Sequence, residues 1–398
     1  MNRSIPQRQL ALAALFLVPG IGIASWVTRT PDIRDLLGAS TFEMGLVLFG
    51  LSLGSMLGIL VSGPLVARFG ARPIIAAGAT SIALSMPLIG IGTGISEALV
   101  AAAGLFLFGA GMGGGEIALN VEGADIEQVT GRSFLPRLHG FFSLGTVIGA
   151  LVGILATASA FPVSIHMVII GLLALIAVCL AMPRIPSGTG RAPREASGSP
   201  RAARAQLWRD PTLLLIGVII LAMALAEGTA NDWLPLVMVD GHGFDAASGS
   251  AIYAVFAAAM TIGRFVGGWF IDRFGRAAVL CASGVFGAIG LALLIFVDNP
   301  VIATVAVLLW GLGASLGFPV AISAAGDSGP DAAARVSLVA TLGYVAFLVG
   351  PPALGFFGDE FGLRTALIIP FVLVSLAAFA ALAYGRRTRP ALEVERAA

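Results

Sequence analysis

Three ionisable side chains stand inside long apolar stretches of this sequence, and a fourth opens another such stretch. Glu116, Glu227 and Arg264 have runs of Ala, Gly, Leu, Ile, Met and Val on both sides, and His139 precedes a similar run. A charge placed among apolar groups is costly unless a partner or a wet cavity receives it. Each of the four is therefore a candidate for binding a ligand or a proton.

Two of these carboxylates have an amide at helical spacing. Glu116 and Asn120, like Glu227 and Asn231, are four residues apart, which places both side chains on one face of a helix. A carboxyl group held away from water takes up a proton more readily than one in solution. Glu227, roughly 22 Å along its helix, is the leading candidate to bind a substrate or a proton. The alternatives are a purely structural hydrogen bond for Glu227 and a cytoplasmic position beyond the helix end for Glu116.

Asp232 extends this set, and His139 and Arg264 complete it. Asp232 points about 100° away from the preceding residue on the same helix, and we expect it at the outer mouth beside Trp233. His139 titrates near physiological pH and can relay protons, or it can stand at the level of the lipid headgroups. Arg264 can hold an anionic group of a substrate, or it can form an internal ion pair or extend towards the membrane surface.

Aromatic rings near the same stretches offer surfaces for stacking. Trp26, Trp233, Phe318 and Tyr344 could each receive a sugar ring or an aromatic solute. The alternative for each ring is packing against lipid or other helices.

The elements that must position these groups are membrane helices. Hydrophobic residues make up 58% of the 398 residues and charged residues only 11%, which is too little polar surface for a soluble particle. About 20 apolar residues cross a bilayer, and we predict twelve such helices in an all-α membrane protein. They span residues 9–28, 42–64, 73–93, 97–119, 138–159, 162–182, 211–230, 249–271, 277–297, 300–325, 336–357 and 364–384.

The arginines predict the orientation of these helices. All 23 basic residues are Arg, and 19 of them fall on one side of the membrane if both termini share that side. Cytoplasmic loops carry the excess of positive charge. Both termini are therefore predicted to be cytoplasmic, in a multi-pass protein of the bacterial inner membrane.

One long polar break divides the chain. Residues 183–210 are mainly Gly, Ser, Pro, Ala and Arg, which predicts a flexible cytoplasmic linker. The predicted domains are thus an N-terminal six-helix bundle at 1–182 and a C-terminal bundle with a short cytoplasmic tail at 211–398.

An internal repeat links the two bundles. The string GPLVARFG at 63–70 returns as GWFIDRFG at 268–275, so both copies follow the second helix of their half. Parallel repeats of this kind place a substrate site at midmembrane depth. The repeated positions that we assign to a gating motif are Gly63, Arg68 and Gly70 in the first copy and Gly268, Asp272, Arg273, Gly275 and Arg276 in the second.

This motif resembles that of the major facilitator superfamily, which has Gly-x-x-x-Asp-Arg-x-Gly-Arg between helices 2 and 3. The second copy matches in full, whereas the first has Ala67 in place of the Asp. In the family this acid helps to latch the halves together on the cytoplasmic side, so the resemblance implies a working latch in the second copy only. It also implies the superfamily fold, with twelve transmembrane helices in two six-helix bundles.

Shorter strings are similar to a bacterial branch related to fucose-permease-like sugar:proton symporters. They are WVTRTP at 26–31, NV at 120–121, HGFFSLG at 139–145, EGTANDW at 227–233 and GPPALG at 350–355. The first string adds Arg29 to the candidate site residues beside Trp26. The resemblance implies a secondary transporter that works by alternating access, with proton-coupled symport of a small polar solute such as a sugar as the leading hypothesis. Proton-driven efflux of drugs or metabolites is the alternative, followed by a nutrient sensor that does not transport.

The sequence also argues against other classes of protein. It contains no lysine and hence no Gly-x-x-x-x-Gly-Lys-Ser/Thr loop, and no HExxH or CxxC string. We therefore expect no enzyme activity, no cofactor and no metal site. The expected partners are a small solute, protons and the lipid bilayer, with no nucleic acid, and the protein is expected to be a monomer.

Overall fold

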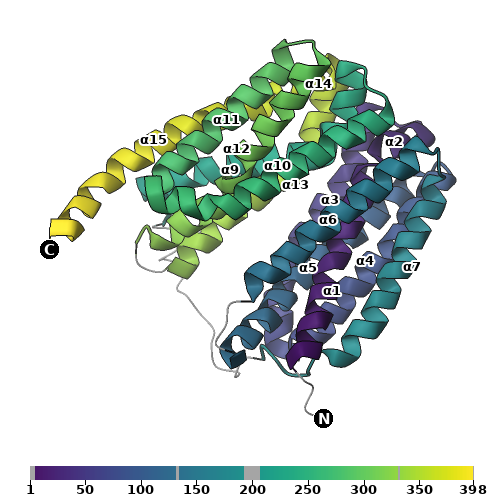
Figure 1. Cartoon of the computed structure of the whole chain (residues 1–398), viewed down its shortest axis with the longest axis horizontal. Helices are drawn as coiled ribbons and strands as arrows, with labels where there is room; N and C mark the ends of the chain where they lie inside the picture. Colours follow the sequence, from purple (N-terminus) through teal and green to yellow (C-terminus); the bar gives the residue numbers. More distant parts are fainter. Residues whose placement is uncertain (1–4, 131–133, 192–206, 330–331, 398) are drawn as a thin grey trace. The chain divides into compact units, whose positions relative to one another are not determined.

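The computed structural model (Figure 1) describes residues 5–130, 134–191, 207–329 and 332–397 of the chain. Twelve helices in these ranges are long and apolar enough to cross a membrane, as predicted. They are α1 (Ile5–Val27), α3 (Thr41–Phe69), α4 (Ala71–Gly94), α5 (Ala98–Thr130), α6 (Leu135–Ala158), α7 (Val163–Ala181), α9 (Pro211–Leu236), α10 (Ala246–Phe274), α11 (Arg276–Phe296), α12 (Pro300–Asp327), α13 (Ala332–Phe361) and α15 (Ile368–Ala397).

Several helices are longer than predicted, and short elements join them. The helix predicted at 97–119 continues as α5 to Thr130, and the one predicted at 211–230 continues as α9 to Leu236 and then as a π-helical turn, η2 (Val237–Gly241). The other short elements are α2 (Thr30–Leu37), the 3-10 turn η1 (Met182–Arg184) and α14 (Leu363–Ala366).

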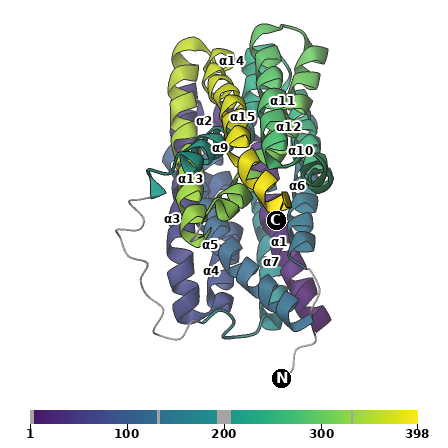
Figure 2. The same cartoon turned by 90° about the vertical axis from the view of Figure 1, so that its left-hand side faces the viewer.

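The described chain divides into two compact units. The first unit comprises residues 1–196 together with 244–254, and the second comprises 197–243 together with 255–398. In the first, α3 and α4 pack against α5, and α1 packs against α6 and α7. In the second, α11 packs against α12 and α15, and α9 packs against α13 and α15 (Figure 2). Equivalent pairs therefore pack in both units, as expected for a repeat of six helices.

Small residues allow these helices to approach closely. Gly54 of α3 and Gly109 of α5 face each other, and a Cβ on either would lie about 2.0 Å from a carbonyl oxygen of the opposite helix. Such contacts drive helix association in lipid, where apolar side chains gain nothing by leaving the solvent. The outward faces carry exposed Leu, Ile, Val and Phe side chains instead, among them Leu155, Leu173 and Phe265.

The repeated motif makes the same turn in both units. Gly70 joins α3 to α4 with φ +87° and ψ 167°, and Gly275 joins α10 to α11 with φ +79° and ψ 160°. Only glycine adopts this region of backbone space without strain. The motif is thus a structural requirement for a tight turn between two membrane helices.

Replacing Gly275 with Ala is expected to lower the free energy of unfolding by about 1–3 kcal/mol, because the new side chain strains this backbone conformation. Gly268→Ala is the matched control from the same motif. It lies inside α10, where an added Cβ meets no atom within 4 Å and alanine favours the helix. Thermal unfolding in detergent should show a loss for the first variant and none for the second. Equal losses would contradict the backbone argument.

The start of the predicted linker packs onto the first unit. Ile185 is fully buried, and the backbone N–H of Ala71 donates to the carbonyl of Thr189 at 2.8 Å. A Cβ at Gly190 would lie 2.7 to 2.9 Å from side-chain atoms of Val66 and Val121. Residues 185–191 therefore cover the turn between α3 and α4, while residues 192–206 of the predicted linker lie outside the described residues.

Candidate functional site

Two of the predicted site residues form an ion pair in the second unit. A guanidinium nitrogen of Arg264 on α10 lies 3.0 Å from a carboxylate oxygen of Glu227 on α9. The Nε of Arg264 also donates to the carbonyl of Ser315 on α12 at 3.4 Å. The side chain of Glu227 is 14% exposed and that of Arg264 is 40% exposed. The pair thus joins α9, α10 and α12, and part of the Arg264 guanidinium group stays accessible.

The α9 residues that follow Glu227 differ sharply in exposure. Asn231, one turn further on, is half-buried, whereas Asp232 is only 5% exposed and Trp233 is fully buried. We expected Asp232 at the outer mouth beside Trp233. It lies instead in the interior of the second unit, because α9 and η2 continue for nine residues beyond it.

The aromatic candidates of the second unit lie in or near its core. Phe318 packs in a cluster with Leu225, Ala346 and Phe347, which come from α9 and α13. Its ring is the nearest group to the position that a Cβ on Gly343 would take. Tyr344 is half-buried on α13. Phe318 therefore holds three helices together in this structure.

In the first unit, Glu116 and Asn120 lie well inside α5 rather than at its end. Glu116 is exposed, and Asn120 is half-buried, with a buried side-chain oxygen that accepts no hydrogen bond from the residues that the structure describes. His139 on α6 is exposed, with its ring edge-on to Phe16 at a centroid distance of 5.3 Å. The alternative in which the helix ends before Glu116 is thus incompatible with α5, which continues to Thr130.

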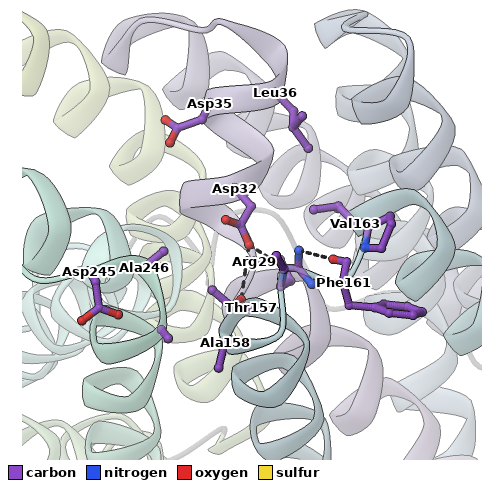
Figure 3. A pocket seen from close by; sticks show the side chains of 13 residues that line it. Arg29, Asp32, Asp35, Leu36, Thr157, Ala158, Phe161, Val163, Asp245 and Ala246 are labelled. Carbon is purple, nitrogen blue, oxygen red and sulfur yellow. Dashed lines mark hydrogen bonds and ion pairs between the residues drawn. The ribbon is translucent and has the colours of Figure 1, made fainter.

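Trp26 and Arg29 lie at the end of α1. Trp26 is fully buried, and its indole N–H has no acceptor in the described part of the chain. Arg29 donates to Asp32 at 2.6 Å and to the carbonyl of Phe161 at 2.8 Å, and Thr157 donates to the same oxygen of Asp32 at 3.2 Å (Figure 3). These contacts tie α1, α2 and the α6–α7 turn together.

A cavity of about 660 Å³ lies beside this cluster (Figure 3). Arg29, Asp32, Asp35 and Asp245 are the charged groups on its wall. Hydrogen bonds from the side chain and backbone of Ser248 hold the pKa of Asp245 below its usual value. The cavity wall is therefore mainly acidic, and its one guanidinium is already paired with a carboxylate.

His166 of α7 is a buried residue for which the sequence shows no supporting pattern. It is buried, and neither ring nitrogen has a hydrogen-bond partner among residues 5–130, 134–191, 207–329 and 332–397. The charge of Arg29 lies close enough to act on it. Periodicity could not have singled out His166, because a histidine on an apolar helix gives the same pattern whether or not it has partners.

The two copies of the gating motif differ in their charged contacts. Arg276 pairs with Asp327 at the end of α12 at 2.5 Å, whereas Arg68 stands over the ring of Phe69 at 5.1 Å. Asp272 and Arg273 are exposed in the second unit. A latching role for Asp272 stays a prediction.

A buried ion cluster was not predicted. Arg8 of α1 donates through Nε to Glu122 and through a terminal nitrogen to Asp125, both at 2.6 Å. Glu122 is fully buried on α5. A sequence signal was present, because apolar residues continue at helical spacing from Ala118 through Ile126.

A second ion pair holds the start of α9. Asp210 accepts from the backbone N–H groups of Thr212 and Leu213 and from Arg335 of α13, the last at 2.8 Å. Burial alone would raise the pKa of Asp210. The hydrogen bonds outweigh this effect and hold the pKa of Asp210 below its usual value. Helix capping and an ion pair thus act on one carboxylate.

Two repeated units of six membrane helices, each with an ion pair between its helices, define a polytopic protein with the architecture of secondary transporters. The family model of the Major Facilitator Superfamily matches residues 10–344. The chain belongs to this superfamily and is a multi-pass membrane transporter rather than an enzyme.

Individual relatives agree with this assignment. An uncharacterised MFS-type transporter of Yersinia pestis is 30% identical over 376 residues, which cover 94% of this chain and 95% of that protein. A mutant of the nucleoside transporter NupG has a similar crystal structure, with a TM-score of 0.78, 16% identity and coverage of 95% and 99% of the two chains. The crystal structure of a variant of the fucose:proton symporter FucP of E. coli is also similar. Its TM-score is 0.64, its sequence identity is 20%, and the match covers 96% of this chain and 99% of that chain. These two structures establish the similarity of fold.

Proposed function

We propose that this protein carries a small polar solute, such as a sugar, across the bacterial inner membrane together with protons, with both termini in the cytoplasm. The single observation that carries the proposal is the ion pair between Glu227 and Arg264. Neither charge is needed by an apolar bundle, and both stand on helices that are long and apolar enough to cross a membrane. Charged groups at such depth mark solute and ion pathways in membrane proteins.

The chemistry of the pair suits a hydroxylated solute. The carboxylate accepts hydrogen bonds and the guanidinium donates them, so adjacent hydroxyl groups of one ring can be bound in a fixed orientation. The exposed part of Arg264 leaves donors available without breaking its contact with Glu227. Half-buried Asn231, one turn along α9, can add an amide to the same face.

Two further lines support the proposal. The similar folds include a fucose:proton symporter and a nucleoside transporter, and fucose and nucleosides both contain a sugar ring. Nineteen of the 23 arginines lie on the side of the membrane that we assign to the cytoplasm.

In the first unit, Glu116, Asn120 and His139 remain candidates for solute or proton binding.

Reconstitution of the purified protein into liposomes tests the proposal. Preloaded unlabelled fucose, xylose or uridine should drive counterflow of the same labelled compound, and an inward proton gradient should raise its accumulation above equilibrium. Accumulation driven by an outward proton gradient would indicate efflux instead. Binding without counterflow would indicate a sensor and would overturn transport by this chain.

A further inference from the structure

Three neighbouring polar side chains on α9 are buried without partners. Thr229, Asp232 and Trp233 are each at least 95% buried. The hydroxyl of Thr229 and the indole N–H of Trp233 have no hydrogen-bond partner within the described part of the chain. Asp232 likewise forms no hydrogen bond or ion pair with a described residue. Spacings of three and four residues place Asp232 and Trp233 on the same side of the helix as Thr229.

No charged group of the surrounding helices is paired with Asp232. The elements packed against α9 are chiefly α12, α13 and α15. Their described charged or titratable groups are Asp327, Arg335, Tyr344, Asp359, Glu360, Tyr384, Arg386 and Arg387, and none of them forms a hydrogen bond or an ion pair with Asp232. Beyond α9, Arg364 is paired with Asp298. The carboxyl group therefore has neither a counter-ion nor a donor.

An ionised carboxylate in such a place carries the full cost of its lost hydration. We infer that Asp232 is a proton-binding site, which holds its proton in this state and releases it to water when this face of α9 becomes hydrated. This inference deepens the proposed function and rests on it for its role in transport. It assigns different roles to the two carboxylates of α9. Glu227 is paired with the guanidinium of Arg264 and binds solute with it, whereas Asp232 has no such partner and binds a proton.

Infrared spectroscopy of the purified protein in detergent at neutral pH tests this inference without any solute. Exposed carboxylates are ionised at this pH, so the C=O stretching band of a protonated carboxyl group reports buried acids. We expect Asp232→Asn to remove from that band the area of one carboxyl group. Asp232→Ser, which keeps a small polar side chain without a carboxyl group, should do the same and serves if the Asn variant does not fold.

Glu227→Gln is the matched control on the same helix and should leave the band unchanged. An unchanged band in both Asp232 variants would overturn the inference, and so would loss of the band in Glu227→Gln alone. Because no solute is present, neither result depends on the proposed function. Absence of counterflow by the wild-type protein would contradict the proposed function. The infrared result on the protonation of Asp232 would still stand.

Discussion

Replacement of Glu227 by Gln is expected to weaken solute binding by at least tenfold. A hydrogen bond to a charged group contributes about 1.5–3 kcal/mol, and 1.4 kcal/mol corresponds to a factor of ten in affinity. The variant keeps the size of the side chain but loses the charge that accepts from the solute and from Arg264 at 3.0 Å. Arg264→Ala should have an effect at least as large, because it also leaves Glu227 without its counter-ion.

Counterflow in liposomes measures this effect as an increase in the solute concentration that gives half-maximal exchange. Asp298→Asn is the control, since it removes a carboxylate from another arginine pair of the second unit, with Arg364 at 3.3 Å. Asp298 is 82% exposed, and such surface pairs contribute little. Equal behaviour of the Asp298 and Glu227 variants would show that the inner pair is only structural.

Arg264→Lys distinguishes solute binding from simple charge balance. Lysine keeps the positive charge but cannot present two parallel donors, so it neutralises Glu227 without binding two oxygens at once. We expect a variant that folds as well as the wild type and exchanges solute with lower affinity. If the Arg264→Lys variant binds solute with wild-type affinity, Arg264 serves only to balance the charge of Glu227.

The twelve helices and the six-helix repeat could be predicted because both depend on local composition. Apolar runs of membrane length identify the helices, and the strings at 63–70 and 268–275 identify the repeat. Positive φ angles at Gly70 and Gly275 explain why those strings contain glycine at the same place. The ends of the helices were less accurate, because charged residues were interpreted as the start of a loop.

The candidate site was predicted residue by residue but not as an arrangement. Glu227 and Arg264 each stand out among apolar residues, yet they are 37 positions apart on different helices. Helical spacing relates residues only within one helix, so the sequence alone could not predict their contact. Asp232 was assigned to the mouth of the protein because the predicted helix ended at 230, whereas α9 continues to Leu236.

The same limit explains the unpredicted ion cluster of the first unit. The helix predicted at 97–119 left Glu122 and Asp125 in a cytoplasmic loop, where acidic residues need no partner. In the structure α5 continues through both of them, and Arg8 reaches them from α1, 114 and 117 positions away. Charges near a helix end can thus be interior residues when another helix supplies the opposite charge.

Replacing Arg8 with Met is expected to lower the free energy of unfolding by about 3–5 kcal/mol, the usual cost of leaving one member of a buried ion pair without its partner. Glu122 is fully buried, and its second carboxylate oxygen already has no hydrogen-bond partner among the described residues. Loss of the 2.6 Å contact with Arg8 would therefore leave the buried carboxylate without its cationic partner. Thermal unfolding in detergent should show a lower midpoint for this variant.

Two further variants separate the cost of an unpaired charge from the loss of packing. Asp125→Asn should change the midpoint little, because its side chain is 38% exposed and water can replace Arg8. Adding Glu122→Gln to Arg8→Met should recover much of the lost stability, since no charge then remains buried. If the double variant is as unstable as Arg8→Met alone, the loss comes from the packing of the arginine side chain against α5, and the electrostatic explanation fails.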